Sequence, residues 1–490
     1  MKPLTRLTTF FLLLFVFNSY SQAIQFKKVY GGNGYDYGYS VIQTYDKGYA
    51  ISGTTSSSGN GNTDAFILKT DSLGILLWHK TFGGINVDQA YSIKETADTG
   101  LIIAGYTNSF GHGGYDMYVI KTNKQGDTLW TKTYGGTNWD FAYSIEQTND
   151  KGYIITGGTY SYGNGNEDMY LVKIDSVGDT LWTKTYGGIN DEEAKSVKQT
   201  SDSGYVITGY TKSFGAGNSD IYYIKTNIQG DTLWTKTVGN IGVDMGTSII
   251  QKIDGGYALA GYVYDTALSV NQAITINTTG NGDIIWTMKN GAPNDAASNT
   301  IIQANDGKLV WAGKLNLGGQ NDIYLYKYGL TANWIFSTTF GTSNGNEEAF
   351  CIQQTSDLGY IIVGTTNGIG FGLNDIFLVK TDSTGFSSGS IVIGINDIEK
   401  IQSNINIYPN PFSENTTIKI NLPEINNTPL LFSVFDEMGK MVIVTQNVRS
   451  LINNKEVTFE LNGKDLNSGI YFLRLIAPNA VYNKKFIVQH

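Results

Sequence analysis

The chain has little of several residue types on which common classes of protein depend. A single cysteine, Cys351, excludes an intramolecular disulfide framework, and the three histidines lie too far apart for the spacing of a zinc site. Only 16% of the residues are charged, and the net charge of −9 argues against nucleic acid or an anionic membrane as a partner. Prolines number 7, beside 59 glycines and 32 tyrosines. This composition favours short strands joined by tight turns over helices.

One long apolar run is present, and it lies at the N-terminus. Lys2 and Arg6 precede "FFLLLFVF", residues 10–17, which is too short to span a bilayer as a helix but has the length of the apolar part of a signal peptide. Small residues follow in "NSYSQA". We therefore expect residues 1–23 to be a signal peptide, cleaved after Ser21 or after Ala23, and the mature chain to have no transmembrane anchor.

An internal repeat dominates the rest of the chain. The phrase "GDTLWTKTYGG" occurs at residues 126–136 and again at 178–188, and a near copy begins at Gly230. Repeat units of about 50 residues are typical of propellers and solenoids. Starting from a degenerate copy at Phe26, we count seven units, whose first aromatic residues are Phe26, Trp78, Trp130, Trp182, Trp234, Trp286 and Trp334.

Each unit has the pattern of four short strands. In the unit that starts at Trp130, the strands are predicted at residues 142–148, 153–160, 169–175 and 180–186, with Gly, Asn and Asp between them. Seven such units predict an all-β fold, a seven-bladed β-propeller over residues 24–385. A right-handed β-solenoid is the alternative, although its coils are usually shorter.

The two ends of the repeat region suggest how the ring closes. The last unit stops after its third strand, whereas the chain begins with an unpaired fourth strand, "QFKKVYGG". The N-terminal strand can therefore complete the last blade as its outer edge, which removes an exposed edge. The repeated tryptophans are then expected to pack between neighbouring blades, so that the repeated phrase is structural.

Two sets of acidic residues repeat with the units. One set lies in D-G or D-x-G turns between the first two strands and is interpreted as structural. The other set precedes the first, innermost strand: Asp36, Asp88, Asp140, Glu192, Asp244 and Glu347, with Asp295 one residue out of register. These carboxylates could ring one mouth of the central channel, or each could cap a turn of its own blade, which perfect repetition favours.

The loops between the second and third strands should emerge at the same mouth. They are rich in Gly and Asn and carry aromatic residues: Phe110, Tyr115, Tyr160, Tyr162, Phe214 and Phe371. A carboxylate ring beside exposed aromatic residues could bind a cation such as calcium, or a sugar by stacking and hydrogen bonding. The predicted ligand-binding residues are Asp36, Asp88, Asp140, Glu192, Asp244, Glu347, Phe110, Tyr115, Tyr162 and Phe214. No cofactor, metal site or catalytic set is predicted.

The sequence changes character after the repeats. Residues 386–406 have the composition of a linker, and residues 407–490 lack the repeat and predict a small Ig-like β-sandwich. This segment contains "IYPNPF", "FSVFDEMGKMV", "LNSGIYFLRL" and "KKFIVQH" in that order. It resembles the type A C-terminal sorting domain of type IX secretion substrates in Gram-negative bacteria. The resemblance implies export across both membranes, with the secretion machinery as a partner and an extracellular or cell-surface location.

The resemblance says nothing about the task of residues 24–385. We consider first a binding module for a glycan or a protein, because an acidic and aromatic loop face comes without a catalytic signature, and we expect no enzyme activity. A structural surface or adhesin component is the first alternative. The second is a propeller hydrolase acting on extracellular polysaccharide, for which no carboxylate pair stands out in the sequence.

Overall fold

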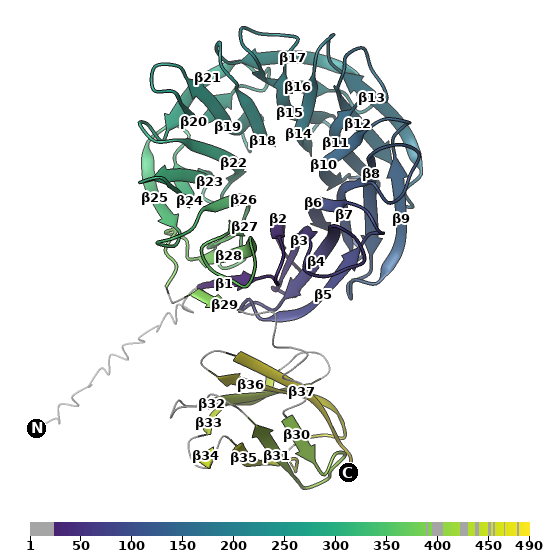
Figure 1. The fold of residues 1–490 in the computed structure, drawn as a ribbon, viewed down its shortest axis with the longest axis vertical. Coiled ribbons are helices and arrows are strands. Elements are labelled where there is room, and N and C mark those ends of the chain that lie inside the picture. The colour runs from purple at the N-terminus through teal and green to yellow at the C-terminus, as the bar shows by residue number, and fades with distance from the viewer. Residues whose placement is uncertain are drawn as a thin grey trace, which may run out of the picture.

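The computed structural model describes residues 24–388, 391–393, 405–421, 430–436, 441–448, 452–453, 456–464, 466–477 and 480–490. The predicted signal peptide lies outside these residues. Every regular element in the described part of the chain is a β-strand, which confirms the all-β prediction. No helix that is long and apolar enough to cross a bilayer occurs among the described residues. Seven of the described sheets follow one another around a ring (Figure 1), and two more belong to the C-terminal part.

Six sheets of the ring each contain four consecutive antiparallel strands. The first three sheets consist of β2 (Asp36–Gln43), β3 (Tyr49–Thr55), β4 (Asp64–Thr70) and β5 (Leu76–Phe82); β6 (Asp88–Glu95), β7 (Leu101–Thr107), β8 (Asp116–Thr122) and β9 (Thr128–Tyr134); and β10 (Asp140–Gln147), β11 (Tyr153–Thr159), β12 (Asp168–Ile174) and β13 (Thr180–Tyr186). The next three consist of β14 (Glu192–Gln199), β15 (Tyr205–Thr211), β16 (Asp220–Thr226) and β17 (Thr232–Val238); β18 (Met245–Gln251), β19 (Tyr257–Asp265), β20 (Val270–Thr278) and β21 (Ile284–Asn290); and β22 (Ala296–Gln303), β23 (Leu309–Leu317), β24 (Gln320–Tyr328) and β25 (Trp334–Phe340).

The remaining sheet of the ring joins the two ends of the repeat region. Its strands are β26 (Glu347–Gln354), β27 (Tyr360–Thr366), β28 (Asp375–Thr381), β1 (Phe26–Tyr30) and β29 (Ile391–Ile393), in that spatial order. The N-terminal β1 pairs antiparallel with β28, with Val29 opposite Phe377, so the predicted closure is confirmed. Unexpectedly, β29 pairs parallel with the outer side of β1, so the segment predicted as a linker contains a strand.

The repeated phrase "GDTLWTKTYGG" docks each sheet onto the next. The tryptophan ring covers the phrase's first glycine in the following sheet, as Trp130 covers Gly178, whose φ of 86° also favours glycine. The tyrosine hydroxyl donates a hydrogen bond to the carbonyl of the same glycine, over 2.7 Å from Tyr134 to Gly178. The lysine pairs with the aspartate beside it, at 2.9 Å between Lys184 and Asp231. The first glycine, the aspartate, the tryptophan, the lysine and the tyrosine of the phrase therefore all contribute to the contact between sheets.

The last tryptophan in the predicted series does not take this role. Trp334 is 62% exposed, and it begins β25, two positions before the residue that faces the next sheet. Phe336 takes that position and lies against Gly385, where an added Cβ would come within 2.4 Å of the ring. The residue equivalent to the earlier tryptophans is therefore Phe336, two positions after Trp334. The register predicted for this strand from Trp334 is wrong by two residues.

The turns between the first and second strands are tied by buried lysines that the sequence analysis overlooked. In the sheet β10–β13, Asp150 accepts hydrogen bonds from the Gly152 amide and from Thr148, and it pairs at 2.9 Å with Lys173 of β12. Lys173 is only 3% exposed. In the sheet β18–β21 the lysine has moved to Lys252, which pairs with Asp254 at the same distance. These turn aspartates are structural, as predicted.

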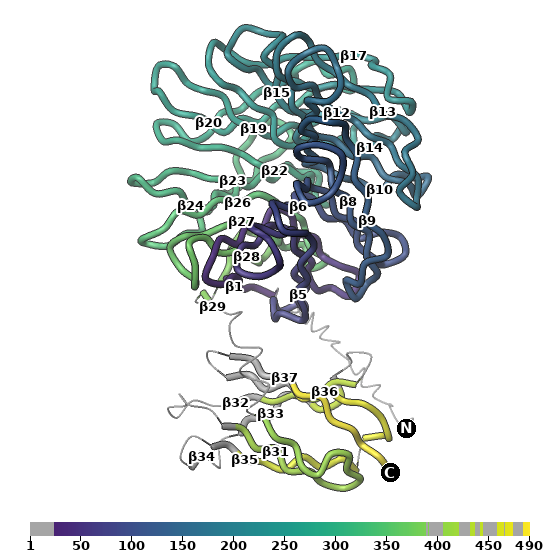
Figure 2. The backbone as a smooth tube through the Cα atoms, turned by 45° about the vertical axis from the view of Figure 1, so that its right-hand side comes forward, coloured from purple at the N-terminus to yellow at the C-terminus, as the bar shows by residue number. Residues whose placement is uncertain are grey.

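The connections between sheets and the second-to-third-strand loops lie at one face of the ring, as predicted. The Asp88 amide donates to the Thr63 carbonyl, and the Asn108 amide donates to the Val87 carbonyl, so the two kinds of loop are hydrogen-bonded to each other. Figures 1 and 2 show the first strand of each sheet nearest the axis of the ring. We call this end of the ring the loop face.

The C-terminal part contains two sheets that share one core. The first consists of β30 (Ile405–Tyr408), β31 (Asn415–Asn421), β35 (Glu456–Asn462) and β34 (Ile452–Asn453), and the second of β33 (Met441–Val448), β32 (Leu430–Asp436), β36 (Gly469–Ala477) and β37 (Ala480–Val488). Ile418 and Phe459 of the first sheet pack in one cluster with Val434 and Phe486 of the second. Two four-stranded sheets around a common core make a sandwich.

Candidate functional site

A β-bulge in every innermost strand turns one side chain out of the regular alternation. The register of β10 against β11 shifts between Ala142 and Ser144, and the equivalent shift recurs in the other sheets of the ring. Bulges commonly re-aim a side chain in this way. The residues at the seven bulges are Tyr39, Tyr91, Tyr143, Lys195, Thr247, Asn299 and Phe350. We call this set the bulge ring.

The bulge ring is aromatic on one side only. Tyr39 lies 5.3 Å from Phe350 and 4.5 Å from Tyr91, and Tyr91 lies 5.1 Å from Tyr143, between ring centroids. Such spacings are typical of stabilising aromatic pairs. Four neighbouring sheets therefore contribute a continuous arc of rings. This arc breaks the symmetry of the repeat, as a binding site does and a purely structural repeat does not.

More aromatic side chains extend the arc towards the loop face. Tyr91 contacts Tyr106 at 5.6 Å, Tyr106 contacts Tyr115 at 5.2 Å, and Tyr115 contacts Trp139 at 6.0 Å. Trp139 in turn lies 5.9 Å from Tyr160 and is 51% exposed. Tyr37 and Phe141 stack on Tyr39 and Tyr143 of the arc, and Tyr35 stacks on Tyr37. We call the arc and all these residues together the aromatic mouth.

The opposite side of the bulge ring is polar and internally bonded. Thr247 donates hydrogen bonds to the carbonyls of Ala260 and Ser298. Asn299 donates to the Glu348 carboxylate at 2.8 Å and to the Ala349 carbonyl. These groups have protein partners, so the polar side offers less stacking surface than the aromatic mouth.

A charged group lies where the arc ends. Lys195 holds its ammonium 3.8 Å from the centre of the Tyr143 ring, a cation–π contact, and it also pairs with Glu193. Behind Glu193 lies Glu167, which is 3% exposed and accepts a hydrogen bond from the Tyr160 hydroxyl at 3.1 Å. Burial, and then the Glu193 carboxylate, raise the pKa of Glu167 to about 8.

The position of Glu167 depends on a local change in the repeat. Residues 106 and 210 are tyrosines, but the equivalent residue in the sheet between them is Gly158. A Cβ added to Gly158 would lie 2.1 Å from Glu167 Oε1, so the missing side chain provides the space for this carboxyl group. Glu167 itself replaces Tyr115 of the preceding sheet. Where the preceding sheet has the tyrosine pair Tyr106 and Tyr115, this sheet therefore has Gly158 and the buried acid Glu167.

The acids predicted to ring the mouth are buried instead. Asp36 is 4% exposed, and each of the other five is fully buried. Asp140 accepts hydrogen bonds from the Gly136 amide and from Thr159 and Ser161 of its own sheet, and Glu192 is bonded in the same manner. These carboxylates therefore cap turns, which was the alternative interpretation.

At the junctions between sheets, the acid that begins the third strand of one sheet lies near the turn-cap acid of the next sheet. Gly31 separates Asp375 from Asp36, since an added Cβ would come within 1.7 Å of Asp375 Oδ1 and 3.1 Å of Asp36 Oδ2. Burial is the main cause that raises the pKa of Asp375 to about 6, and Asp36 adds to it. The described part of the chain holds no group of three or more His, Cys, Asp or Glu side chains placed to bind a metal ion.

Three of the four predicted aromatic residues lie away from the aromatic mouth. Phe110, Tyr162 and Phe214 cover strand tyrosines of their own sheets, with centroid distances of 5.8 Å to Tyr118, 5.6 Å to Tyr170 and 5.6 Å to Tyr222. They repeat with the fold, and they are still 44–47% exposed. Tyr115 alone of the four belongs to the aromatic mouth, where Tyr160, named with the loops, also lies.

A second polar level lies below the bulge ring, towards the other face. Lys198 of β14 pairs with Glu146 of β10 at 2.8 Å. Repulsion from Lys198, and then burial, lower the pKa of Lys94 of β6 to about 8. Since β6 and β14 belong to the sheets on either side of the sheet β10–β13, their lysines influence each other past the innermost strand of that sheet.

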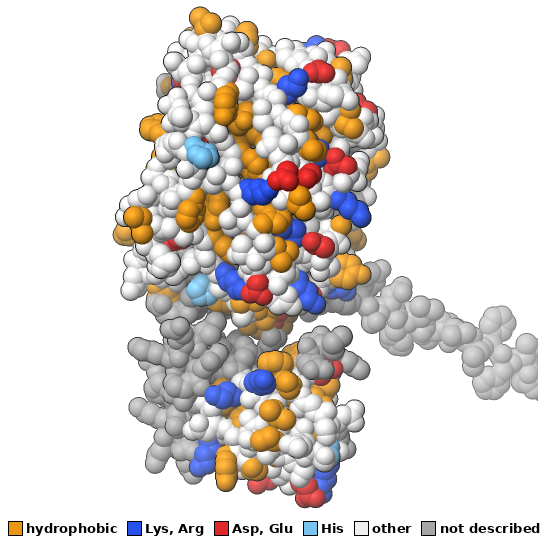
Figure 3. Space-filling model, turned by 90° about the vertical axis from the view of Figure 1, so that its right-hand side faces the viewer, with side chains coloured by type: hydrophobic (Ala, Val, Ile, Leu, Met, Phe, Trp, Pro, Cys, Tyr) orange, Lys and Arg blue, Asp and Glu red, His pale blue; other side chains and the backbone are white. Residues whose placement is uncertain are grey.

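On the outside of the ring, charges of opposite sign lie side by side. Figure 3 shows Lys side chains (blue) beside Asp and Glu side chains (red) on this surface. Lys132 pairs with Asp179, and Lys236 with Asp283, from one sheet to the next. Positive and negative side chains are paired on this surface, and neither sign dominates it. The surface therefore gives no indication of a charged partner.

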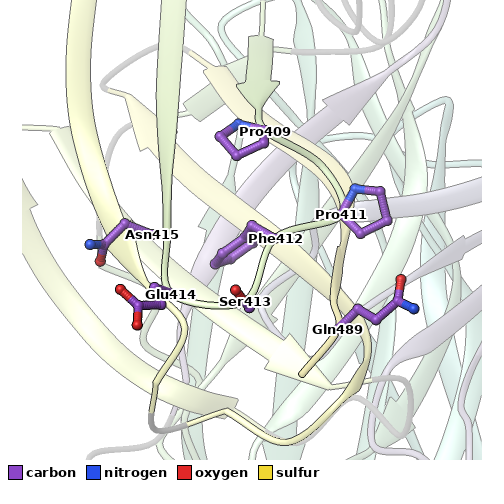
Figure 4. Close-up of a pocket in the computed structure, with 7 residues that line it drawn as sticks. All are labelled: Pro409, Pro411, Phe412, Ser413, Glu414, Asn415 and Gln489. Atoms are coloured by element: carbon purple, nitrogen blue, oxygen red, sulfur yellow. The ribbon is translucent and has the colours of Figure 1, made fainter.

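In the C-terminal sandwich, three of the four quoted motifs come together at one end. Figure 4 shows a hollow at "YPNPF" with the last strand beside it, and its lining residues are Pro409, Pro411, Phe412, Ser413, Glu414, Asn415 and Gln489. Phe412 lies 5.7 Å from Phe486, and the Gln489 amide donates to the Phe412 carbonyl at 2.9 Å. The His490 amide donates to Ser468 of "LNSG". Motifs that are far apart in sequence thus hold the chain end in place.

Comparison with protein families agrees with this architecture. Residues 406–489 match the family described as secretion system C-terminal sorting domain, and they form a type IX sorting domain. Such a domain directs export across the outer membrane to the cell surface or the extracellular space, through interaction with the type IX secretion system.

The repeat region has more distant similarities. The chain is 23% identical over 367 residues to "Regulatory protein FlaEY" of Caulobacter vibrioides, covering 61% of this chain and 37% of the relative's length. Among solved structures, it resembles the β-propeller domain of the Trilobed protease from Pyrococcus furiosus, with a TM-score of 0.40, 11% identity, and coverage of 73% of this chain and 95% of the other. It also resembles the polysaccharide lyase Uly1, with a TM-score of 0.45, 8% identity, and coverage of 71% and 90%.

Proposed function

Because the chain carries a type IX sorting domain and is exported, we propose that its ring of sheets is an extracellular carbohydrate-binding module whose ligand lies on the aromatic mouth. The observation that carries the proposal is the asymmetric arc of contacting aromatic rings from Phe350 through Tyr39 and Tyr91 to Tyr143. The repeat by itself does not require aromatic residues there, since three other sheets have Lys195, Thr247 and Asn299 at the same position.

The chemistry of the mouth suits a sugar. Aromatic faces bind the C–H-rich faces of pyranose rings, and a few polar groups at the edge of a site fix the orientation of the ligand. Trp139 and Tyr160 are exposed at 51% and 37%, so the mouth presents ring surface to solvent. Glu193 and Lys195 lie at the end of the arc, and both can hydrogen-bond a sugar hydroxyl.

A binding function accounts for these contacts better than hydrolysis does. A glycoside hydrolase needs two carboxyl groups that reach the glycosidic bond from either side. Glu167 is 3% exposed and lies behind Glu193, so one member of this pair cannot contact a substrate. The six turn-cap carboxylates are buried as well.

The proposal is tested by titrating the secreted chain with cellohexaose, xylohexaose, mannohexaose and laminarihexaose by calorimetry. We expect at least one of these neutral hexasaccharides to bind, and Tyr143→Ala and Phe141→Ala to weaken binding by about tenfold each. Phe214→Ala is the matched control, because Phe214 is also an exposed phenylalanine but packs on Tyr222 of its own sheet, away from the aromatic mouth. An equal loss in the control, or no binding of any hexasaccharide, would contradict the proposal.

A further inference from the structure

The symmetry of the ring is broken most strongly at Glu167, Glu193 and Lys195. Glu193 is the accessible member, with a side chain 12% exposed, and its carboxylate contacts the Lys195 ammonium. Glu167 lies behind Glu193 and is 3% exposed. One of its two carboxyl oxygens accepts a hydrogen bond from the Tyr160 hydroxyl. The arrangement places one acid towards the ligand and a second acid directly behind it.

The second oxygen of Glu167 needs a donor. Glu167 Oε1 is buried and has no hydrogen-bond partner among the described residues. Its neighbours there are the Gly158 backbone, which leaves the space for it, and the Glu193 carboxylate. Two carboxylates cannot hydrogen-bond each other unless one of them carries a proton. Leaving a buried polar atom unsatisfied is costly, so a proton between the two acids is the arrangement that satisfies both.

Charged and titratable groups on several elements surround the pair. The described groups that interact with Glu167, Glu193 or their tyrosine neighbours include Tyr143 of β10, Tyr160 and Asp191 in loops, Lys195 of β14, Tyr210 of β15, Tyr106 of β7 and Tyr262 of β19. Asp191 is paired with Lys212 at 2.7 Å. Lys195 therefore balances one negative charge of the pair, and the second must be removed by a proton.

We infer that Glu167 and Glu193 share one proton and, with Lys195, form an uncharged polar niche that selects neutral sugars over uronic acids at the aromatic mouth. The inference rests on the proposed carbohydrate-binding function and adds the class of sugar. Glu193 accepts hydroxyl groups of the ligand, Lys195 donates to them, and Glu167 is a positioning residue that acts through Glu193. Because the niche carries no net charge, it does not compensate for the hydration that the carboxylate of a uronic acid loses on binding.

The pH dependence follows from the same arrangement. Burial and Glu193 raise the pKa of Glu167 to about 8, so the proton is present at neutral pH and is lost as the pH rises through this value. The pair then carries two negative charges against one ammonium. The repulsion moves the Glu193 carboxylate, and neutral ligands lose their acceptor.

The experiment uses the tightest-binding neutral hexasaccharide and hexagalacturonate as probes of the secreted chain. We expect the neutral probe to bind at least about tenfold more tightly than hexagalacturonate, and its Kd to rise about tenfold between pH 6 and pH 9. In Glu167→Gln the amide supplies a permanent donor and no charge, so the preference for the neutral probe should persist and its Kd should no longer depend on pH. Glu193→Gln should remove the pH dependence in the same way.

Glu348→Gln is the matched control, because this acid lies on the polar side of the ring and bonds Asn299. Its Kd for the neutral probe should still rise about tenfold between pH 6 and pH 9, as in the unmodified chain. A readout without ligand is the carbon NMR titration of labelled glutamate, in which one carboxyl should titrate near pH 8 and disappear in Glu167→Gln. Binding that is independent of pH, or equal for both probes, overturns the proton-sharing niche but leaves the proposed function standing. No binding of any neutral hexasaccharide overturns both.

Discussion

The ammonium of Lys195 lies 3.8 Å from the centre of the Tyr143 ring, at the point where the arc of aromatic residues ends. Both residues occupy the bulge of an innermost strand, one sheet apart. Lys195→Ala removes the cation that balances Glu193 and opens the ring face of Tyr143. We expect the affinity for the neutral hexasaccharide to fall about tenfold, because the ligand loses the ammonium group that donates hydrogen bonds to its hydroxyl groups. Calorimetry on the variant measures this, and an affinity equal to that of the unmodified chain would show that the arc alone binds the ligand.

The tryptophans of the repeat offer a test of how the sheets are held together. Trp182 lies against Gly230 and 5.9 Å from Tyr205, whereas Trp334 is 62% exposed. Trp182→Ala should lower the free energy of unfolding by about 2–3 kcal/mol, since it leaves a cavity between two sheets. Trp334→Ala, the matched control, should change it by less than about 0.5 kcal/mol. Denaturant unfolding of both variants compares the two positions, and equal losses would contradict the assignment of Phe336 to the docking position.

The buried lysine of each turn predicts a strong coupling. Asp150→Ala leaves the Lys173 ammonium buried without its partner and should cost about 3 kcal/mol of unfolding free energy. The double variant with Lys173→Met should recover a large part of this loss, because the unpaired charge is then absent. The measurement is a double-mutant cycle by denaturant unfolding. Losses that simply add would mean that the pair is not coupled.

The acids at the junctions between sheets predict how stability depends on pH. Burial raises the pKa of Asp375 to about 6, above the value of about 4 in an unfolded chain. The folded state therefore binds the proton more tightly, so stability falls as the pH rises from about 4 to above 6. Asp375→Asn should remove this loss and raise the unfolding free energy at pH 8 by about 1–3 kcal/mol, with less effect at pH 5. Thermal unfolding at the two pH values distinguishes this from a variant that is stabilised equally at both.

Much of the architecture was predictable because the same strand and turn pattern recurs in every repeat unit. Four strands per unit, tight turns at the Asp and Gly positions, and closure by the N-terminal strand follow from the spacing of Trp78 to Trp286 and from the unpaired strand at Phe26. The register of the sheet β22–β25 did not follow, since Trp334 is not equivalent to the other tryptophans. Strand β29 was missed because three residues in a polar segment carry no pattern of their own.

The site was harder to predict, for a physical reason. The perfectly repeated acids, such as Asp88 and Asp140, stand out in the sequence, but repetition reflects a turn that every sheet must cap. The site lies where the repeat changes, at Gly158, Glu167 and Lys195. Each change affects a single residue, so it does not stand out in the sequence of one unit. An alignment of the seven units on the bulge position would have shown Phe, Tyr, Tyr and Tyr beside Lys, Thr and Asn. The bulge itself, which turns these side chains to one ring, has no signature in the sequence.

The most direct test of the account is to locate the bound sugar by hydrogen–deuterium exchange. The secreted chain is measured with and without a saturating neutral hexasaccharide. We predict slower exchange in the peptides that contain Tyr35, Trp139 and Glu193, at the aromatic mouth and its polar end. Protection confined to the outer loops around Phe110 and Phe214, or to the C-terminal sandwich, would contradict it.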